Sequence, residues 1–377
     1  MSLMDPDIIY QMALSGIPNL GPVKQSGLID FFSSAKKVFS AGYKELLETG
    51  LLNEHEAALI KAVERFDGYT AQIKVLRDSH IRVLSYKDML YPARLRQIAS
   101  FPILLYYRGA IDLLNQKNIL AVVGSRHMTD YGRNVLRDFI PALTDQGVVI
   151  VSGMAFGVDV TAHILCLDAK GKTVAVQAQG VEKGHPAAHA GVFQRIMDNG
   201  GCVISEFPFI ENGAVEKFHF PRRNRLISGM SDAVLVVEAA EKSGALITAR
   251  YAIEQNRDCF AVPGSIYQNT SRGCLNLIKD GAGVACAVQD ILEGLGLVKR
   301  SHEKQEELPF TETRVATDHL ETPLERQILV CCKDRPVSMD ELVDMVREPA
   351  SFVTATITKM QLMGKLKEVE GKKFAAV

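Results

Sequence analysis

Residues 217–229 combine cationic and aromatic side chains in one short stretch, Lys-Phe-His-Phe-Pro-Arg-Arg-Asn-Arg-Leu-Ile-Ser-Gly, with four cations, two phenylalanines and no acidic residue. Lysine and arginine neutralise phosphates, and an aromatic ring offers its face to a base, so this combination is typical of proteins that bind a single nucleic-acid strand. Stacking contributes about 1 to 3 kcal/mol per base, which favours a splayed strand over a duplex. We therefore expect this stretch to contact phosphates through Lys217, Arg222, Arg223 and Arg225, and to stack Phe218 or Phe220 on a base.

The same stretch also has a structural interpretation. One of its phenylalanines could belong to the core, and two of its arginines could pair with carboxylates such as Glu206 or Glu238. We expect this interpretation to hold in part, with Asn224 and Arg225 engaged inside a helix.

Small and polar residues follow several apolar runs, at places where a ligand could lie. In Gly-Ser-Arg at 124–126, glycine allows close approach, serine can bond a phosphate oxygen, and arginine supplies a bidentate cation. Residues 152–159 and 243–248 are each expected to open a helix, whose free backbone amides attract anions. A tight turn without a ligand is the alternative for each loop, and the agreement among several loops favours a binding site.

The elements that position these loops are short runs rich in Val and Ile, separated by helical patterns. Continuous hydrophobicity is typical of strands buried on both faces, so the runs predict a doubly wound, mostly parallel sheet in an α/β domain. Ligands of such sheets bind at the carboxyl ends of the strands. Neither Gly-x-Gly-x-x-Gly nor Gly-x-x-x-x-Gly-Lys-Ser/Thr occurs, which disfavours dinucleotide binding and P-loop hydrolysis. The runs are Ile119–Val123, Val148–Val151, Thr173–Val176, Cys202–Ile204, Ala233–Val237, Cys259–Val262 and Gly283–Cys286.

Different patterns flank the sheet domain. Residues 7–79 show helical periodicity, and 17–24 resemble the hairpin of a helix-hairpin-helix, although an ordinary helix connection is favoured. Residues 300–318 are charged and poor in apolar residues, which indicates a linker. The expected organisation is a helical SAM-like or helix-hairpin-helix-like domain (1–85), the sheet domain (86–299), the linker (300–318) and a winged helix-turn-helix (319–377).

The expected winged helix has a balanced charge. Residues 320–377 contain nine basic and nine acidic residues, and the third helix (351–363) contains only Lys359 as a cation. Because a recognition helix needs positive charge to position phosphates, a protein contact or a weak DNA-assisting role is favoured over sequence-specific reading. Lysines in the hairpin keep the DNA interpretation open; they are Lys365, Lys367, Lys372 and Lys373.

Composition gives little global information on partners. With 43 basic and 44 acidic residues among 377, the net charge is −1, so any nucleic-acid site must come from local segregation of charge. We expect a cytoplasmic protein, because neither a run of eighteen apolar residues nor a secretory pattern is found. No catalytic motif stands out, and Pro186 between His185 and His189 disfavours a metal-binding pair. We expect no metal, no cofactor and no enzymatic activity.

Taken in order, the motifs resemble those of the DNA-processing protein A family (DprA, also called Smf). The matching motifs are Gly-Ser-Arg at 124–126, Ser-Gly-Met-Ala-x-Gly-Val-Asp at 152–159, Ser-Glu-Phe-Pro at 205–208, the stretch at 217–229, Val-Val-Glu-Ala at 236–239, Ser-Gly-Ala-Leu-Ile-Thr-Ala at 243–249 and Ala-Val-Pro-Gly at 261–264. The resemblance implies an extended Rossmann-like domain that binds single-stranded DNA without a cofactor. It also implies a homodimer that helps to load the RecA recombinase onto incoming strands in natural transformation.

The resemblance also implies roles for individual residues. Arg126 and Lys217 would contact phosphates, and Phe220 would stack or act as a wedge. The complete set of expected DNA-binding residues is Gly124, Ser125, Arg126, Ser152, Gly153, Lys217, Phe220, Arg222, Arg223, Asn224, Ser243 and Gly244.

The chain departs from the family pattern at two places. Residues 181–189 replace the usual Gly-Leu-Asp and Tyr-Pro and keep only Pro186, and Leu275 stands where asparagine is usual.

Two other functions are alternatives to single-strand binding. A phosphoribohydrolase on a related fold would need a Pro-Gly-Gly-x-Gly-Thr loop, which 243–248 lacks. A winged-helix transcription regulator would need a more cationic third helix.

Overall fold

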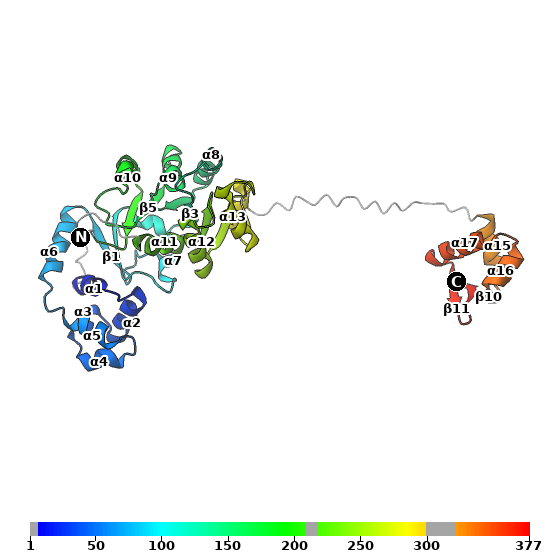
Figure 1. Cartoon of the computed structure of the whole chain (residues 1–377), viewed down its shortest axis with the longest axis horizontal. Coiled ribbons are helices and arrows are strands. Elements are labelled where there is room, and N and C mark those ends of the chain that lie inside the picture. Colours follow the sequence, from blue (N-terminus) through cyan, green and yellow to red (C-terminus); the bar gives the residue numbers. More distant parts are fainter. Residues whose placement is uncertain (1–6, 209–217, 299–321) are drawn as a thin grey trace. The chain divides into compact units, whose positions relative to one another are not determined.

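The computed structural model describes residues 7–208, 218–298 and 322–377 of the chain (Figure 1). These residues belong to two compact units, Met1–Arg300 and Ser301–Val377. The second unit has a hydrophobic core of its own, formed around residues such as Ile328, Leu342 and Ile357. Among the described residues, no helix has the length and apolar character needed to cross a membrane. Lys217 and the expected linker at 300–318 lie outside the described residues.

The first unit begins with six helices, as the periodicity of 7–79 predicts. Local capping fixes several of them: the Asn53 side chain accepts a hydrogen bond from the Glu56 amide, and the Glu56 carboxylate accepts one from the Asn53 amide. Residues of these helices, such as Leu14 and Leu28, share one core cluster with sheet residues such as Leu105. The helices are α1 (Ile8–Ser15), α2 (Pro22–Phe32), α3 (Ala35–Ser40), α4 (Tyr43–Glu48), α5 (Glu54–Lys61) and α6 (Asp67–Asp78).

A nine-stranded sheet follows, in the order β1-β2-β6-β5-β4-β3-β7-β8-β9. The strands from β6 to β9 in this order are parallel, and each of the seven apolar runs forms one of them, which confirms the mostly parallel sheet. The strands are β1 (Arg82–Ser85), β2 (Leu104–Gly109), β3 (Ile119–Val123), β4 (Val149–Ser152), β5 (Thr173–Gln177), β6 (Cys202–Ser205), β7 (Ala233–Val236), β8 (Asp258–Ala261) and β9 (Gly283–Val284).

Two strands were not anticipated. β1 pairs with β2, and β2 pairs with β6, both in antiparallel fashion. The sheet therefore begins upstream of Ile119, where the sequence pattern placed its start, and it includes residues before position 86.

Helices cover both faces of the sheet, so its strands are buried on both sides. Along β3, Ile119, Ala121 and Val123 belong to one core cluster and Leu120 and Val122 to the other. In Figure 1, α8 and α9 lie along one face, and α11 and α12 lie along the other. The helices after β1 are α7 (Ala93–Arg96), α8 (Asp130–Asp145), α9 (Val158–Asp168), α10 (Ala190–Asp198), α11 (His219–Gly229), α12 (Gly244–Glu254), α13 (Asn269–Lys279) and α14 (Val288–Gly294).

The strand order reverses at β3. From β3 the chain proceeds outward through β4, β5 and β6, and then returns to form β7 on the other side of β3. Connections that leave neighbouring strands in opposite directions open a crevice at their carboxyl ends, which is the usual ligand site of open α/β sheets. The sheet therefore places a crevice beside Val123 and Val236, the last residues of β3 and β7.

The described part of the second unit, residues 322–377, contains three helices and a small antiparallel sheet in the order β10-β12-β11. The three expected helices and the C-terminal hairpin are present, and Gly371 occupies the turn of the hairpin with a φ of +85°. Assignment of this unit as a winged helix stays a prediction. The elements are α15 (Pro323–Cys332), β10 (Val337–Ser338), α16 (Met339–Val346), α17 (Ala350–Leu362), β11 (Leu366–Val369) and β12 (Lys373–Ala376).

Candidate functional site

A pocket of about 510 Å³ lies at the carboxyl ends of β3 and β7, where the strand order reverses. We call it the switch-point pocket. Its walls come from the loop after β3, the first residues of α11 and the start of α12. The structure thus brings together most of the expected DNA-binding residues: Gly124, Ser125, Arg126, Phe220, Arg223, Asn224, Ser243 and Gly244 all line this pocket.

The loop after β3 approaches the start of α9 closely. A Cβ atom on Gly124 would lie 2.6 Å from Val158 Cγ2, so glycine is required there. Ser125 is tied to both sides of the loop, because its carbonyl accepts the Val158 amide and its hydroxyl accepts the His127 amide at 3.1 Å. These contacts hold the following residue, Arg126, at the mouth of the pocket.

The N-terminus of α12 forms the opposite wall. The Ser243 hydroxyl caps this helix by accepting the Ala245 amide at 3.3 Å, and the first turn contains no acidic residue. Unpaired amides and the helix dipole give this end a partial positive charge. Gly244 is exposed, and a Cβ atom there would meet nothing within 4 Å. With Lys242 beside it, the wall suits an anion.

Arg126 and Phe220 lie next to each other at the rim. The Arg126 guanidinium carbon stands 5.2 Å from the centre of the Phe220 ring, within the range of a cation–π contact. Arg126 is exposed, and no described residue forms a hydrogen bond or ion pair with its side chain. Its charge is therefore available to a phosphate, while Phe220 is only partly buried.

Arg223 has a different environment, because its side chain is only 5% exposed. Its guanidinium donates to the Gly153 carbonyl at 2.5 Å and the Val176 carbonyl at 2.7 Å, and its Nε donates to the Asn224 amide oxygen at 3.0 Å. Burial lowers the pKa of Arg223 to about 10, so the group stays charged at neutral pH. Arg223 thus fixes the loop after β4 while lining the pocket.

Three expected residues, Ser152, Gly153 and Arg222, do not line the switch-point pocket. Ser152 is fully buried at the end of β4, and its hydroxyl donates to the Val122 carbonyl at 2.6 Å. Arg222 donates to Glu206 at 2.9 Å, and Arg225 approaches the same carboxylate at 2.6 Å. The structural interpretation of two arginines paired with Glu206 therefore applies, as expected in part.

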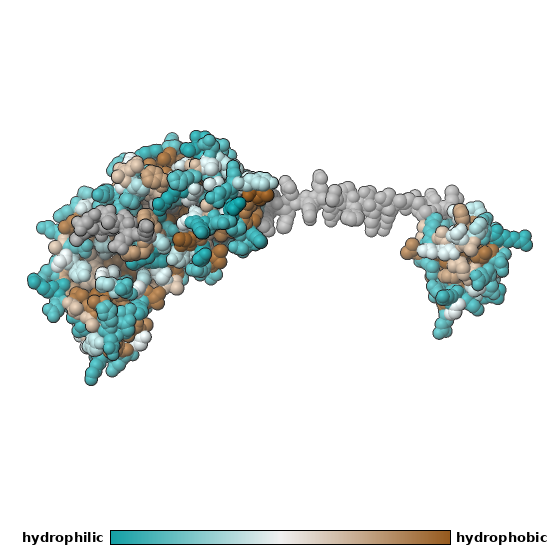
Figure 2. Space-filling model, viewed as in Figure 1, coloured by the Kyte–Doolittle hydropathy of each residue, from teal (hydrophilic) through white to brown (hydrophobic). Residues whose placement is uncertain are grey.

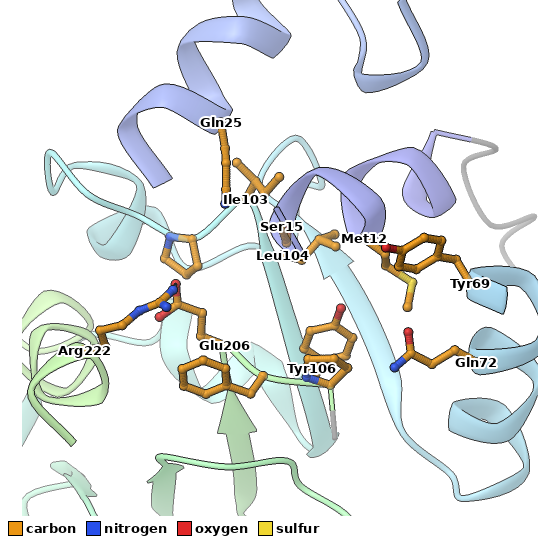
Figure 3. Close-up of a pocket in the computed structure, with 14 residues that line it drawn as sticks. Met12, Ser15, Gln25, Tyr69, Gln72, Ile103, Leu104, Tyr106, Glu206 and Arg222 are labelled. Atoms are coloured by element: carbon orange, nitrogen blue, oxygen red, sulfur yellow. The ribbon is translucent and has the colours of Figure 1, made fainter. Parts of the chain in front are cut away.

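Figure 3 shows the surroundings of Arg222 and Glu206, a separate pocket of about 280 Å³. Side chains of α1 and α6, such as Met12 and Tyr69, face Glu206 across it. Glu238, the other carboxylate considered for an arginine, instead accepts the Thr129 amide and hydroxyl at 2.8 and 2.6 Å.

A third pocket of about 290 Å³ adjoins the switch-point pocket at the ends of β4 and β5. We call it the adjoining pocket. The loop 181–189, which departs from the family pattern, forms one wall through His185 and Pro186, whereas Leu275 lines neither pocket. Gly153 lies here too, where a Cβ atom would come within 2.1 Å of Arg223 Nη1.

Several residues that line the two pockets are not among the expected DNA-binding residues. Lys242 and His127 line the switch-point pocket, and Phe156 lines the adjoining one. Each lies within or next to a loop that contains one of the motifs, so its position in the sequence could have predicted that it lines a pocket. His189, weighed for a metal, bonds the Met154 carbonyl at 2.8 Å. Among the described residues, no cluster of three His, Cys, Asp or Glu side chains could hold a metal ion.

The fold and the site together define an open α/β protein with a cationic, anion-suited crevice at a topological switch point. Comparison with known families gives a consistent assignment. The model of the family described as DNA recombination-mediator protein A matches residues 82–296, and the chain belongs to this family.

Individual relatives agree with the assignment. Protein Smf of Synechocystis is 31% identical over 97% of this chain and 98% of its own length. The solved structure of DNA processing protein A from Streptococcus pneumoniae aligns with a TM-score of 0.64 at 32% identity, covering 76% of this chain and 96% of that one. The structure reported for the single-stranded DNA binding mode of DNA processing protein A from Helicobacter pylori aligns with a TM-score of 0.51 at 28% identity, over 58% and 97%.

Proposed function

We propose that this chain binds single-stranded DNA, protects incoming strands and helps to load a recombinase of the RecA type in natural transformation or recombination. The observation that carries the proposal is the exposed Arg126–Phe220 pair beside the N-terminus of α12. The single-stranded DNA binding described for the Helicobacter pylori relative supports it. The recombinase step has its support in the name of the family.

In this proposal different residues contact the phosphates and the bases of the DNA strand. The α12 amides and the Ser125 hydroxyl bond phosphate oxygens, while Arg126 neutralises the charge. The Phe220 ring stacks on a base or separates two bases. Lys217, which directly precedes Phe218 at the start of the described segment, adds a second phosphate contact.

The proposal requires no catalytic group. Asp159 is the only carboxylate among the described residues of the switch-point pocket lining, and it is 5% exposed and accepts the Gly153 amide at 3.2 Å. A buried carboxylate turned to its own loop is poorly placed for proton transfer to a ligand. This favours a binding protein over the phosphoribohydrolase alternative.

Further parts of the proposal rest on the sequence pattern and on the family resemblance. We infer a cytoplasmic homodimer with the divisions 1–85, 86–299, 300–318 and 319–377, in which 319–377 is a winged helix that contacts protein or assists DNA binding. Its third helix, α17, contains Lys359 as its only cation, and that cation pairs with Glu325 at 2.8 Å. This pairing favours the protein contact over sequence-specific DNA reading.

The test is fluorescence anisotropy of a labelled oligothymidine and of the matching duplex at two salt concentrations. We expect the chain to prefer the single strand, and Arg126→Ala to weaken binding and lower the salt slope by about one. Lys217→Ala should do the same. Arg137, an exposed residue of α8 that lines neither pocket, supplies the control Arg137→Ala with a wild-type slope. A folded wild type without single-strand preference would overturn the proposal.

A further inference from the structure

The switch-point pocket and the adjoining pocket share a wall. Arg126, Phe220 and Arg223 line both of them. The shared wall separates two chemically different spaces. On one side lie Lys242 and the amides of α12, which suit an anion; on the other side lie the carboxyl ends of β4 and β5.

The adjoining pocket is largely apolar and aromatic. Ala155, Ala178 and Pro186 contribute to its lining, together with Phe156, whose side chain is 49% exposed. The Phe156 ring is held from behind, because it meets the His189 ring at 4.6 Å with an interplanar angle of 65°. His189 is in turn bonded to the Met154 carbonyl. Phe156 therefore presents a ring that packs against His189 and remains partly exposed.

His185 gives this apolar space a polar edge. Its backbone amide donates to Gln177 Oε1 at 3.1 Å, and Gln177 Nε2 donates to the Lys183 carbonyl at 3.2 Å, which anchors the loop on the end of β5. The imidazole itself forms no hydrogen bond with any described residue. Burial and the nearby charge of Arg126 lower the pKa of His185, so at neutral pH the ring offers one donor and one acceptor.

These features match the two halves of a nucleotide. A phosphate needs cations and amides, which lie on the switch-point side. An unstacked base needs an aromatic face and a hydrogen-bonding edge, which Phe156 and His185 supply on the other side. A volume of about 290 Å³ is at the small end of the range for small-molecule sites, which suits one base rather than several.

We propose that the adjoining pocket takes one unstacked base of the bound strand, contacted by Phe156 and His185, while the switch-point pocket holds a neighbouring phosphate. The Arg126–Phe220 pair lies between the two. The inference rests on the proposed single-strand binding and adds to it a base subsite that is distinct from the Phe220 ring.

The test compares an oligothymidine with an oligomer of the same length in which every residue is abasic, at two salt concentrations, on the full chain. The two ligands have the same phosphates, so their affinity ratio isolates the contribution of the bases. Phe156→Ala and His185→Ala should each lower this ratio, the former by at least about fivefold because it removes a stacking ring. Both should keep the wild-type salt slope, which also shows that the phosphate side is intact.

Lys242→Ala is the reciprocal control, because Lys242 lines only the switch-point pocket. It should lower the salt slope by about one and keep the affinity ratio. Wild-type ratios in both Phe156→Ala and His185→Ala would overturn the inference while leaving single-strand binding intact. The inference would also be overturned if these variants lowered the salt slope together with the affinity ratio, since base and phosphate would then not be bound in separate pockets. If the wild type binds no single strand, the proposed function fails first and the inference with it.

Discussion

At the scale of single residues, the cations of α11 show that a charge near a ligand site can serve the protein itself. A buried guanidinium must satisfy its donors, because an unpaired charge in the interior is costly. Arg223 does so on backbone carbonyls, Arg225 forms an ion pair with Glu206, and the partly exposed Arg222 shares that carboxylate. Arg126, in the loop after β3, is left for a ligand because no described residue forms a hydrogen bond or ion pair with its side chain.

The contact between Gly153 and Arg223 leads to a prediction on stability. Gly153→Ala would bring a Cβ atom within 2.1 Å of a guanidinium that is held by two carbonyls. Because Arg223 is buried and cannot turn to solvent, we expect the free energy of unfolding to fall by about 1 to 3 kcal/mol. Urea denaturation followed by circular dichroism measures this loss.

Gly244→Ala is the matched control for this experiment. It adds the same methyl group at a helix position of the neighbouring switch-point pocket, where nothing lies within 4 Å. Its free energy of unfolding should equal that of the wild type or exceed it by up to about 1 kcal/mol, since alanine favours a helix over glycine. If the free energy of unfolding of Gly153→Ala equals that of Gly244→Ala, Arg223 moves freely, contrary to its described contacts.

At the scale of elements, the sequence predicted best what local patterning determines. Runs such as Ile119–Val123 are apolar throughout because alternate residues enter two different cores, and this property is visible without any knowledge of partners. β1 and β2 were missed because β2 joins the sheet through a strand far along the chain: Tyr106 of β2 lies opposite Ser205 of β6, about a hundred residues away. Neither strand belongs to the repeating strand–helix pattern from which the sheet was inferred.

The site was predictable to the same extent. Parallel strands bring their carboxyl ends to one edge, so the loops at 124–126 and 243–248 could be placed together from the strand pattern. Which cations remain free could not be predicted, because it depends on partners from distant elements. Glu206 follows β6 and Gly153 follows β4, yet they bind side chains of α11.

The contact between α15 and α17 leads to a prediction on pH. Lys359 Nζ lies 2.8 Å from Glu325 Oε1, and Glu325 is 2% exposed. The hydrogen bond from Lys359 holds the pKa of Glu325 below its ordinary value of 4.5. A carboxyl group with a lowered pKa contributes stability above the pKa of the unfolded chain, and this contribution is lost as the pH falls through the folded pKa.

We therefore expect the free energy of unfolding of the second unit to fall on acidification. Between pH 7 and pH 3.5 this fall should be about 1 kcal/mol smaller in Glu325→Gln than in the wild type. Urea titrations followed by the methyl NMR signals of Ile357, in the core of that unit, report on it selectively. Asp334→Asn, at an exposed carboxylate of the same unit, is the control and should behave as the wild type. An identical acid response in Glu325→Gln would assign the loss to other carboxylates.

At the scale of the whole molecule, the near-zero net charge hides a local arrangement. Basic and acidic residues number 43 and 44, so the field of the whole chain does not attract DNA. The attraction has to come from charges gathered at the carboxyl ends of the β-strands. There the fold gathers Arg126, Lys242 and the N-terminus of α12 around one pocket. The visible face of each unit mixes hydrophilic and hydrophobic residues (Figure 2).

The division into two units leads to the last prediction. Every described residue of the switch-point and adjoining pockets belongs to the first unit, which has its own core clusters. A chain that ends at Val298 should therefore bind oligothymidine with the affinity and salt slope of the full chain. Anisotropy titrations of both chains at two salt concentrations measure this, with circular dichroism to confirm folding of the shorter one.

A fall in salt slope on truncation would instead mean that cations of the second unit contact the strand, since each phosphate neutralised adds about one unit to the slope. The full-chain variant Lys372→Ala/Lys373→Ala separates the two explanations of such a fall. Both lysines are exposed at the hairpin of β11 and β12, and their loss leaves the core of the unit unchanged. If this variant reproduces the truncation, the hairpin binds DNA directly; if it keeps the wild-type slope, other cations of the second unit contact the strand.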